Sequence, residues 1–258
     1  DGVGGSAGGE IASQTAARAT LAGWKHFLKR SWSSDRYHES PFVVSRKPVT
    51  DLCHVLKHLI LEADELVRTE GATRAGTNDL ATTVALGAFC RDKQTQAYTF
   101  VYAHVGDSRI YIQRKEEKLQ RLTDDDGLLS KLVENQLVND ADAQRIDQAT
   151  SASYLSDVEY NYFRLRGGIT QALGGPNPPT IHINEIAVHA GDRILLCTDG
   201  IHDNLTDQEI ENILDNTSRP VTARTLVMES MQRSKQEHNT TIRAKPDDMS
   251  AIVITCRF

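Results

Sequence analysis

Aspartates that adjoin apolar runs are the residues of this chain best suited to chemistry. Asp199 and Gly200 follow the run 194–198, whose aliphatic and β-branched character is typical of a buried strand. A carboxylate at the end of such a strand is held rigidly and partly removed from water. That placement is costly unless a cation or hydrogen-bond donors compensate the charge.

Two further dipeptides that contain aspartate have similar surroundings. Asp1 and Gly2 open the sequence, and Asp247 with Asp248 precedes the apolar run 249–256. Hard cations such as Mg²⁺ and Mn²⁺ prefer carboxylate, carbonyl and water oxygens, and the main-chain carbonyl of a glycine can approach a cation without obstruction. Each pair alone is explained as a turn or as acids at a sheet edge. The three together favour one divalent-metal centre.

Other chemically suggestive residues have simpler explanations. The loop 2–7 loosely fits the phosphate-binding pattern GxGxxA, but no suitable βαβ unit follows it. His104 lies in a strand pattern and is expected to be packed. Cys197 lies in an apolar run without a neighbouring histidine, which indicates a core residue rather than a nucleophile. For His202, a role near Asp199 and a position facing solvent are equally compatible with the sequence.

The overall composition limits the function classes. The chain has 258 residues, 39% of them hydrophobic and 25% charged, as in ordinary globular proteins. A net charge of −6 without a long basic run argues against nucleic-acid binding, and no apolar run reaches membrane-spanning length. Four widely spaced cysteines without a CxxC pair predict reduced thiols and a cytoplasmic location.

Hydrophobic periodicity predicts helices and strands that could position the acids. Helical spacing covers residues 10–29, 51–69, 128–137, 139–145, 207–216 and 222–233. Strand patterns cover residues 80–90, 97–105, 109–113, 119–123, 181–188, 194–198 and 249–258. Segment 31–48 is expected to be a loop, 70–79 a turn, and 148–166 a mobile surface flap. A strand meander with helices before and after it predicts an α+β layered domain.

The beginning of the chain suggests a missing element. Asp1 and Gly2 look like the end of a strand whose body is absent, and the first residue is not Met. We therefore expect residues 1–258 to form a single domain that lacks at least one N-terminal strand.

Six segments in order resemble the protein phosphatase 2C family, the metal-dependent Ser/Thr phosphatases, in its bacterial type. They are DGVGGSAGGEIAS (1–13), VGDSRIYI (105–112), LTDDDGLL (122–129), ITQALGG (169–175), ILLCTDGIHDNLTD (194–207) and KPDDMSAIVI (245–254). The resemblance implies a four-layer α-β-β-α sandwich with two antiparallel sheets flanked by helix pairs.

The resemblance also implies a metal centre and a mechanism. Asp1 would bridge two Mn²⁺ or Mg²⁺ ions, the Gly2 carbonyl would bind one of them, and Asp199 and Asp247 would bind the other. Asp107 would belong to a third, weaker metal site shared with Asp199. A water bridging the two cations would attack phosphorus, so that no side chain acts as nucleophile. The implied partner is a protein carrying phosphoserine or phosphothreonine, and the enzyme would be a monomer.

Three departures from the family pattern support an alternative. Ser6 stands where many members have a histidine, and Asp125, Asp126 and Gly127 replace the usual Asp-His-Ser. The family's upstream strand, with its phosphate-binding arginine, precedes the first residue of this chain. The alternative is a pseudophosphatase, in which the same fold serves as a regulatory binding module.

Overall fold

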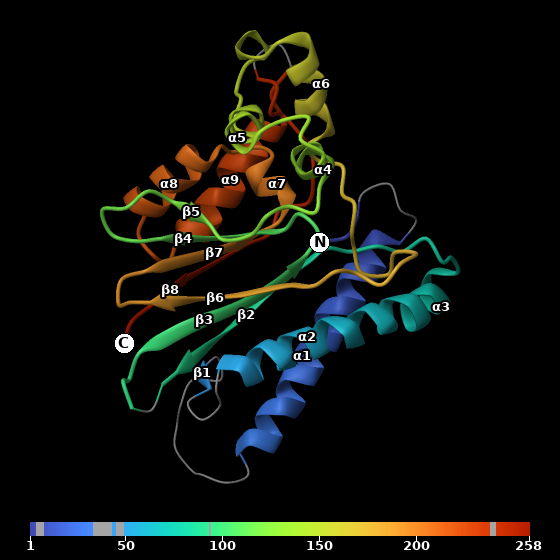
Figure 1. Cartoon of the computed structure of the whole chain (residues 1–258), viewed down its shortest axis with the longest axis vertical. Helices are drawn as coiled ribbons and strands as arrows, with labels where there is room; N and C mark the ends of the chain where they lie inside the picture. Colours follow the sequence, from blue (N-terminus) through green and yellow to red (C-terminus); the bar gives the residue numbers. More distant parts are fainter. Residues whose placement is uncertain (4–7, 33–42, 45–48, 93, 238–240) are drawn as a thin grey trace. The chain divides into compact units, whose positions relative to one another are not determined.

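The chain divides into two units, each built on one four-stranded sheet (Figure 1). The computed structural model describes residues 1–3, 8–32, 43–44, 49–92, 94–237 and 241–258. Unit 1 consists of residues 1–105 and 171–189, and unit 2 of residues 106–170 and 190–258. Each sheet lies entirely within its unit.

Unit 1 packs long helices against a mixed sheet with the strand order β1-β2-β3-β6. Its elements are α1 (Gly9–Trp32), β1 (Val43–Val44), α2 (Val49–Leu66), the π-helix η1 (Val67–Gly71), α3 (Ala72–Ala75), β2 (Val84–Arg91), β3 (Tyr98–Val105) and β6 (His182–Val188). Strands β2 and β3 form the predicted antiparallel hairpin, β6 pairs antiparallel with β3, and β1 pairs parallel with β2.

Small and aliphatic side chains form the core of unit 1. Helices α1 and α2 lie side by side (Figure 1), and Ala12, Ala16 and Leu52 are buried in one cluster with side chains of β2 and β3. A Cβ atom on Gly23 of α1 would lie 2.4 Å from Leu59 Cδ2 of α2. The alanines and this glycine therefore allow the close approach of the two helices.

The prediction of a turn over residues 70–79 is wrong for residues 70–75, which are helical. The helical chain continues through η1 and α3 and ends at Gly76, whose φ of +68° is the left-handed conformation common at helix ends. Gly71 adopts helical dihedral angles, so the helix ends at the second glycine. Within the expected loop 31–48, α1 extends to Trp32 and Val43–Val44 form β1. Residues 33–42 and 45–48 lie outside the described part.

Unit 2 contains the sheet β5-β4-β7-β8, in which every strand pair is antiparallel. Its elements are β4 (Arg109–Gln113), β5 (Gln120–Arg121), α4 (Leu128–Glu134), α5 (Asp140–Asp147), the 3₁₀ helix η2 (Ala152–Tyr154), α6 (Asp157–Leu165), β7 (Arg193–Cys197), α7 (Asp199–His202), α8 (Asp207–Asn216), α9 (Thr222–Ser234) and β8 (Ala251–Thr255). Buried side chains of β4, β7, α8 and α9 share one hydrophobic cluster.

The prediction of a single strand meander over residues 80–123 is wrong, because its strands belong to two sheets. Strand β3 belongs to the sheet of unit 1 and β4 to the sheet of unit 2, and Gly106 connects them with φ of +95°. A residue with a side chain rarely adopts that angle, so the position favours glycine. The α+β class with two sheets and flanking helices is confirmed, and all strand pairs except β1–β2 are antiparallel. The single-domain organisation stays a prediction.

The segment 148–166 contains helical structure that its weak periodicity did not predict. It includes η2 and α6, and α6 starts with a capping box between Ser156 and Glu159. Phe163 of α6 is buried in a cluster with Ile146 and Ala149. The mobility expected of this flap stays a prediction. Among the described helices, none combines the length and apolar character needed to cross a bilayer.

Candidate metal centre

The strand register of unit 2 brings three of the predicted metal ligands to one end of its sheet. Arg109 of β4 pairs with Cys197 of β7, so Asp107 and Asp199 each lie two residues beyond this pair, at the same end. Cys197 also pairs with Ala251 of β8, and Asp247 precedes that strand. An antiparallel sheet with this register therefore gathers Asp107, Asp199 and Asp247 although they are far apart in the sequence.

Asp199 starts helix α7 directly after the buried strand, as predicted. Thr198 is extended, and the helical conformation begins at Asp199. The next residue has to be glycine, because a Cβ atom on Gly200 would lie 2.2 Å from the backbone oxygen of Asp248. The Asp-Gly dipeptide thus lets the segment before β8 lie against the start of α7.

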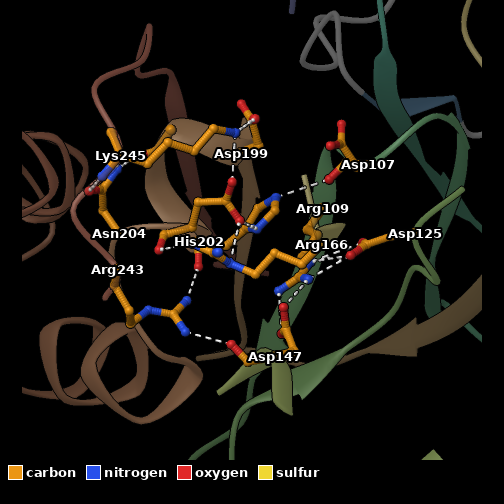
Figure 2. A network of polar contacts seen from close by, with 12 residues as sticks. Asp107, Arg109, Asp125, Asp147, Arg166, Asp199, His202, Asn204, Arg243 and Lys245 are labelled. Carbon is orange, nitrogen blue, oxygen red and sulfur yellow. Dashed lines mark hydrogen bonds and ion pairs between the residues drawn. The ribbon is translucent and has the colours of Figure 1, made fainter. Parts of the chain in front are cut away.

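A lysine ammonium lies among the carboxylates of this group (Figure 2). Lys245 Nζ is 2.6 Å from Asp199 Oδ2, 2.7 Å from Asp203 Oδ2 and 3.2 Å from Asp247 Oδ2. Burial lowers the pKa of Lys245, but the carboxylates of Asp203 and Asp199 outweigh it and raise the pKa above its usual value. Lys245 is therefore charged at neutral pH and compensates part of the negative charge.

The carboxylates remain in excess despite this lysine. Burial, followed by repulsion from Asp199 and Asp125, raises the pKa of Asp107 to about 8. Burial and then the charge of Asp199 also raise the pKa of Asp247. Burial first and the charge of Asp199 second disfavour the ionised form of both acids, and a bound cation would favour that form.

A buried histidine connects α7 with the turn before β4. His202 is 2% exposed, and its Nε2 lies 3.0 Å from the backbone oxygen of Asp107. Because a carbonyl oxygen only accepts, Nε2 carries the proton and donates. Burial, reinforced by Arg109, lowers the pKa of His202 and keeps the ring neutral. Of the two positions that the sequence allowed for this residue, the buried one near the candidate site is observed.

Asn204 and Arg243 hold the segment before β8 against α7. Asn204 Nδ2 donates to the backbone oxygens of Gly200 and Lys245, and Asn204 Oδ1 accepts from the Lys245 amide. The fully buried Arg243 guanidinium donates to four backbone oxygens, those of Asp147, Ala149, His202 and Leu205. These contacts fix the backbone positions from which the Lys245 and Asp247 side chains extend.

A second buried arginine supports the β4 side. Arg109 binds Asp125 through Nε and Nη2, and it binds Asp147 through both terminal nitrogens at 3.2 Å. Burial acts to raise the pKa of Asp147, but Arg109 and Arg243 outweigh it and hold the pKa well below its usual range. Asp125, in the stretch that departs from the family pattern, therefore serves as a partner of Arg109 in this structure.

Asp1 and Gly2 belong to unit 1. The backbone oxygen of Asp1 accepts hydrogen bonds from the Thr82 hydroxyl and the Thr83 amide, and Gly2 forms a β-bridge with Thr82. A Cβ atom on Gly2 would lie 2.3 Å from the backbone of Gly9, so a side chain does not fit there. The assignment of Asp1 and Gly2 to the metal centre stays a prediction. Ser6 lies outside the described residues.

The donor chemistry of unit 2 fits a hard divalent cation. Among the side chains that the structure describes, no group of three His, Cys, Asp or Glu is arranged to hold a metal ion by itself. Lys245 is instead the cation among these carboxylates. The carboxylate oxygens of Asp107, Asp199 and Asp247 are the ligand type that Mg²⁺ and Mn²⁺ prefer, and their mutual repulsion favours a cation.

Sequence analysis did not identify the residues that support these acids. These supporting residues contact partners up to 96 positions away in the sequence, and no local spacing reveals the pairs; they are Arg109, Asp147, Asp203, Arg243 and Lys245. The one available signal was Lys245 next to the Pro-Asp-Asp sequence, where a basic residue adjoins two acids.

The chain matches a model of protein phosphatase 2C over residues 1–240. The serine/threonine protein phosphatase PstP of Mycobacterium tuberculosis is 28% identical over 186 residues, which is 67% of this chain and 31% of that protein. The serine/threonine phosphatase stp of Listeria monocytogenes is 23% identical over 214 residues, 83% of this chain and 69% of that protein. The chain thus spans about a third of the length of the mycobacterial relative.

Solved structures agree with this match at the level of the fold. The crystal structure of M. tuberculosis PstP/Ppp has a TM-score of 0.65 at 23% identity, covering 98% of this chain and 84% of that one. The catalytic domain of PstP in complex with two manganese ions has a TM-score of 0.62 at 22% identity, with the same coverage. With its two sheets, its gathered aspartates and the match over residues 1–240, the chain belongs to the protein phosphatase 2C family.

Proposed function

We propose that this chain is a metal-dependent phosphatase that hydrolyses phosphoserine and phosphothreonine in proteins. The observation that carries the proposal is the convergence of Asp107, Asp199 and Asp247 at one end of the unit 2 sheet, where burial and the charge of Asp199 raise the pKa values of Asp107 and Asp247. Membership of the family and the two manganese ions in the PstP catalytic domain support it.

The proposed centre holds Mn²⁺ or Mg²⁺, two ions with a weaker third. Asp199 and Asp247 would hold one ion, and Asp107 would contribute to the weaker site. The family resemblance assigns Asp1 and the Gly2 carbonyl to the centre as well. When bound, such ions supply Lewis-acid activation of water and neutralise the phosphoryl oxygens.

The chain's own residues would orient these acids. His202 fixes the backbone at Asp107, and Asn204 fixes the start of α7 relative to Lys245. Cys197 is buried in the core, and burial raises the pKa of its thiol far above the usual value, so the thiol is protonated and unreactive. A mechanism without a covalent enzyme intermediate is consistent with both features.

Hydrolysis of p-nitrophenyl phosphate with and without Mn²⁺ tests the proposal. We expect turnover that chelation with EDTA abolishes and that Mn²⁺ restores. Asp199→Asn should lower kcat/KM at least a hundredfold, because it removes a ligand charge, whereas Cys197→Ala should retain turnover. Turnover that survives EDTA, or that depends on Cys197, would contradict the metal mechanism.

The second candidate function is a pseudophosphatase that binds partners without catalysis. The observation that favours it is Lys245, whose ammonium already pairs with Asp199 and Asp247 and compensates part of their charge. Bound Mn²⁺ without turnover on p-nitrophenyl phosphate or a phosphoserine peptide would support this module over the enzyme.

The proposed partner is a phosphorylated protein, and we expect a monomer in the cytoplasm. The four cysteines are free thiols, which supports a reducing compartment. Gel filtration with light scattering tests the oligomeric state.

A further inference from the structure

Lys245 occupies the position in unit 2 where positive charge is most needed. Its ammonium contacts Asp199, Asp203 and Asp247 within 3.2 Å, and two of these acids are proposed metal ligands. Charge-assisted hydrogen bonds of this kind are about twice as strong as neutral ones. A divalent cation that binds Asp199 and Asp247 therefore has to replace these contacts.

The three carboxylates differ in what binds them besides Lys245. Asp203 is buried, and its Oδ1 lies 3.4 Å from Arg166 Nε, so it stays inside the unit. The side chains of Asp199 and Asp247 are more exposed, at 13% and 29%. Asp203 can therefore keep Lys245 after the other two acids have exchanged the ammonium for a metal ion.

The backbone around Lys245 is fixed, and the end of its side chain lies beside a glycine. Asn204 binds both the amide and the carbonyl oxygen of Lys245, so the Cα position is determined by α7. Gly167 lies beside the ammonium, since a Cβ atom there would be 3.1 Å from Lys245 Nζ. A glycine at this place leaves the space that the end of the lysine side chain occupies.

We propose that Lys245 is an internal competitor of the metal, which sets the cation concentration at which the centre fills. The inference rests on the proposed metal centre and adds a regulatory element to it. The ammonium bridges Asp199, Asp203 and Asp247. Metal binding moves it from Asp199 and Asp247 and leaves it with Asp203. The site thus has lower metal affinity than its carboxylates alone would give.

Isothermal titration of the EDTA-treated full chain with Mn²⁺ tests this competition. Lys245→Met keeps an unbranched side chain one atom shorter and removes the charge, so we expect the Kd for Mn²⁺ to fall about tenfold or more. Lys245→Arg keeps the charge and should bind Mn²⁺ no more tightly than the wild type. Lys131→Met is the matched control, because it removes an exposed lysine of unit 2 whose ammonium pairs with Glu134.

A second readout is thermal unfolding without and with Mn²⁺. Lys245→Met should lower the Tm of the metal-free protein, because the acids then repel one another, and should increase the Tm rise that Mn²⁺ produces. This measurement also shows whether the variant folds. If Lys245→Met does not fold, Lys245→Gln takes its place, because it also removes the charge, and the Kd for Mn²⁺ should again fall; an unchanged or higher Kd would contradict the competition.

The results separate the competition from the metal centre itself. If Lys245→Met binds Mn²⁺ as the wild type does, or more weakly, while Asp199→Asn abolishes binding, the centre stands and the competition is wrong. If neither the wild type nor Lys245→Met shows saturable Mn²⁺ binding, the proposed centre is wrong and Lys245 is only a structural partner of the acids.

Discussion

The imidazole Nε2 of His202 lies 3.0 Å from the backbone oxygen of Asp107 and so joins α7 to the turn before β4. Each end of this hydrogen bond involves a proposed metal ligand. His202 lies in α7, which begins at the proposed ligand Asp199, and the accepting oxygen belongs to the proposed ligand Asp107. The contact therefore transmits any displacement of α7 to the Asp107 backbone. Figure 2 shows the two residues facing each other in the polar network of unit 2.

Replacing His202 by phenylalanine should destabilise the protein. The ring volume is roughly kept, but the buried carbonyl of Asp107 loses its donor, which costs about 1–3 kcal/mol. Urea unfolding followed by circular dichroism measures the change. His58→Phe, at an exposed position of α2, should change the unfolding free energy by less than about 0.5 kcal/mol. Equal stability of the His202 variant and the wild type would show that this hydrogen bond contributes nothing.

Arg243 should tolerate no replacement, not even by lysine. Its fully buried guanidinium serves four backbone oxygens, and a single ammonium cannot reach all of them. We expect Arg243→Lys to lower the free energy of unfolding by about 3 kcal/mol or more, as is usual when a buried charged network is broken. The same urea titration checks it, with the partly exposed Arg145→Lys as control. If Arg243→Lys lowers the free energy of unfolding no more than the control does, the buried guanidinium does not stabilise the fold.

Gly200→Ala should disturb the start of α7. The added Cβ atom would lie 2.2 Å from the backbone oxygen of Asp248, so backbone has to move. Overpacking of this kind costs about 1–3 kcal/mol. Gly71→Ala is the control, because its Cβ atom would meet Leu80 Cδ2 at 3.4 Å, an ordinary contact, in a helical segment. The Tm values of both variants are compared by thermal unfolding. If the Gly200 variant is as stable as the control, the start of α7 and the segment before β8 are not in close contact.

The pairing of Asp147 with Arg109 predicts a loss of stability in acid. The pKa of Asp147 is held below its usual range in the folded protein, so its contribution is complete above the unfolded pKa of about 3.9. The contribution declines as the pH falls from there toward the folded pKa. The free energy of unfolding of the wild type should therefore begin to drop as the pH falls through about 4 and should keep dropping below pH 3.

Asp147→Asn tests the origin of this acid sensitivity. The variant should be less stable at pH 7, because Arg109 loses a buried partner, and its stability should depend less on pH below 5. Asp140→Asn, at an exposed position of the same helix α5, should keep the wild-type pH dependence. An unchanged acid slope in Asp147→Asn would assign the effect to other carboxylates.

Local sequence signals predicted the elements that carry the acids. The apolar run before Asp199 became β7, and α8 has the predicted bounds because Thr206 and Glu209 form a capping box at its start. The helix through Gly71 was missed because a glycine usually interrupts a helix, whereas here it fits in a π-helical turn against Leu80. The partners of Lys245 were not predictable, since it meets Asp199 through the pairing of β7 with β8 and through the Asn204 contacts, all between distant segments.

The most direct test of the metal centre is the binding of Mn²⁺ itself, measured from the electron paramagnetic resonance signal of the free ion. The account predicts saturable binding by the wild type and an apparent Kd at least tenfold higher in Asp199→Asn and in Asp247→Asn, with Cys197→Ala unchanged. Binding that is equally tight in the two aspartate variants and in the wild type would contradict it.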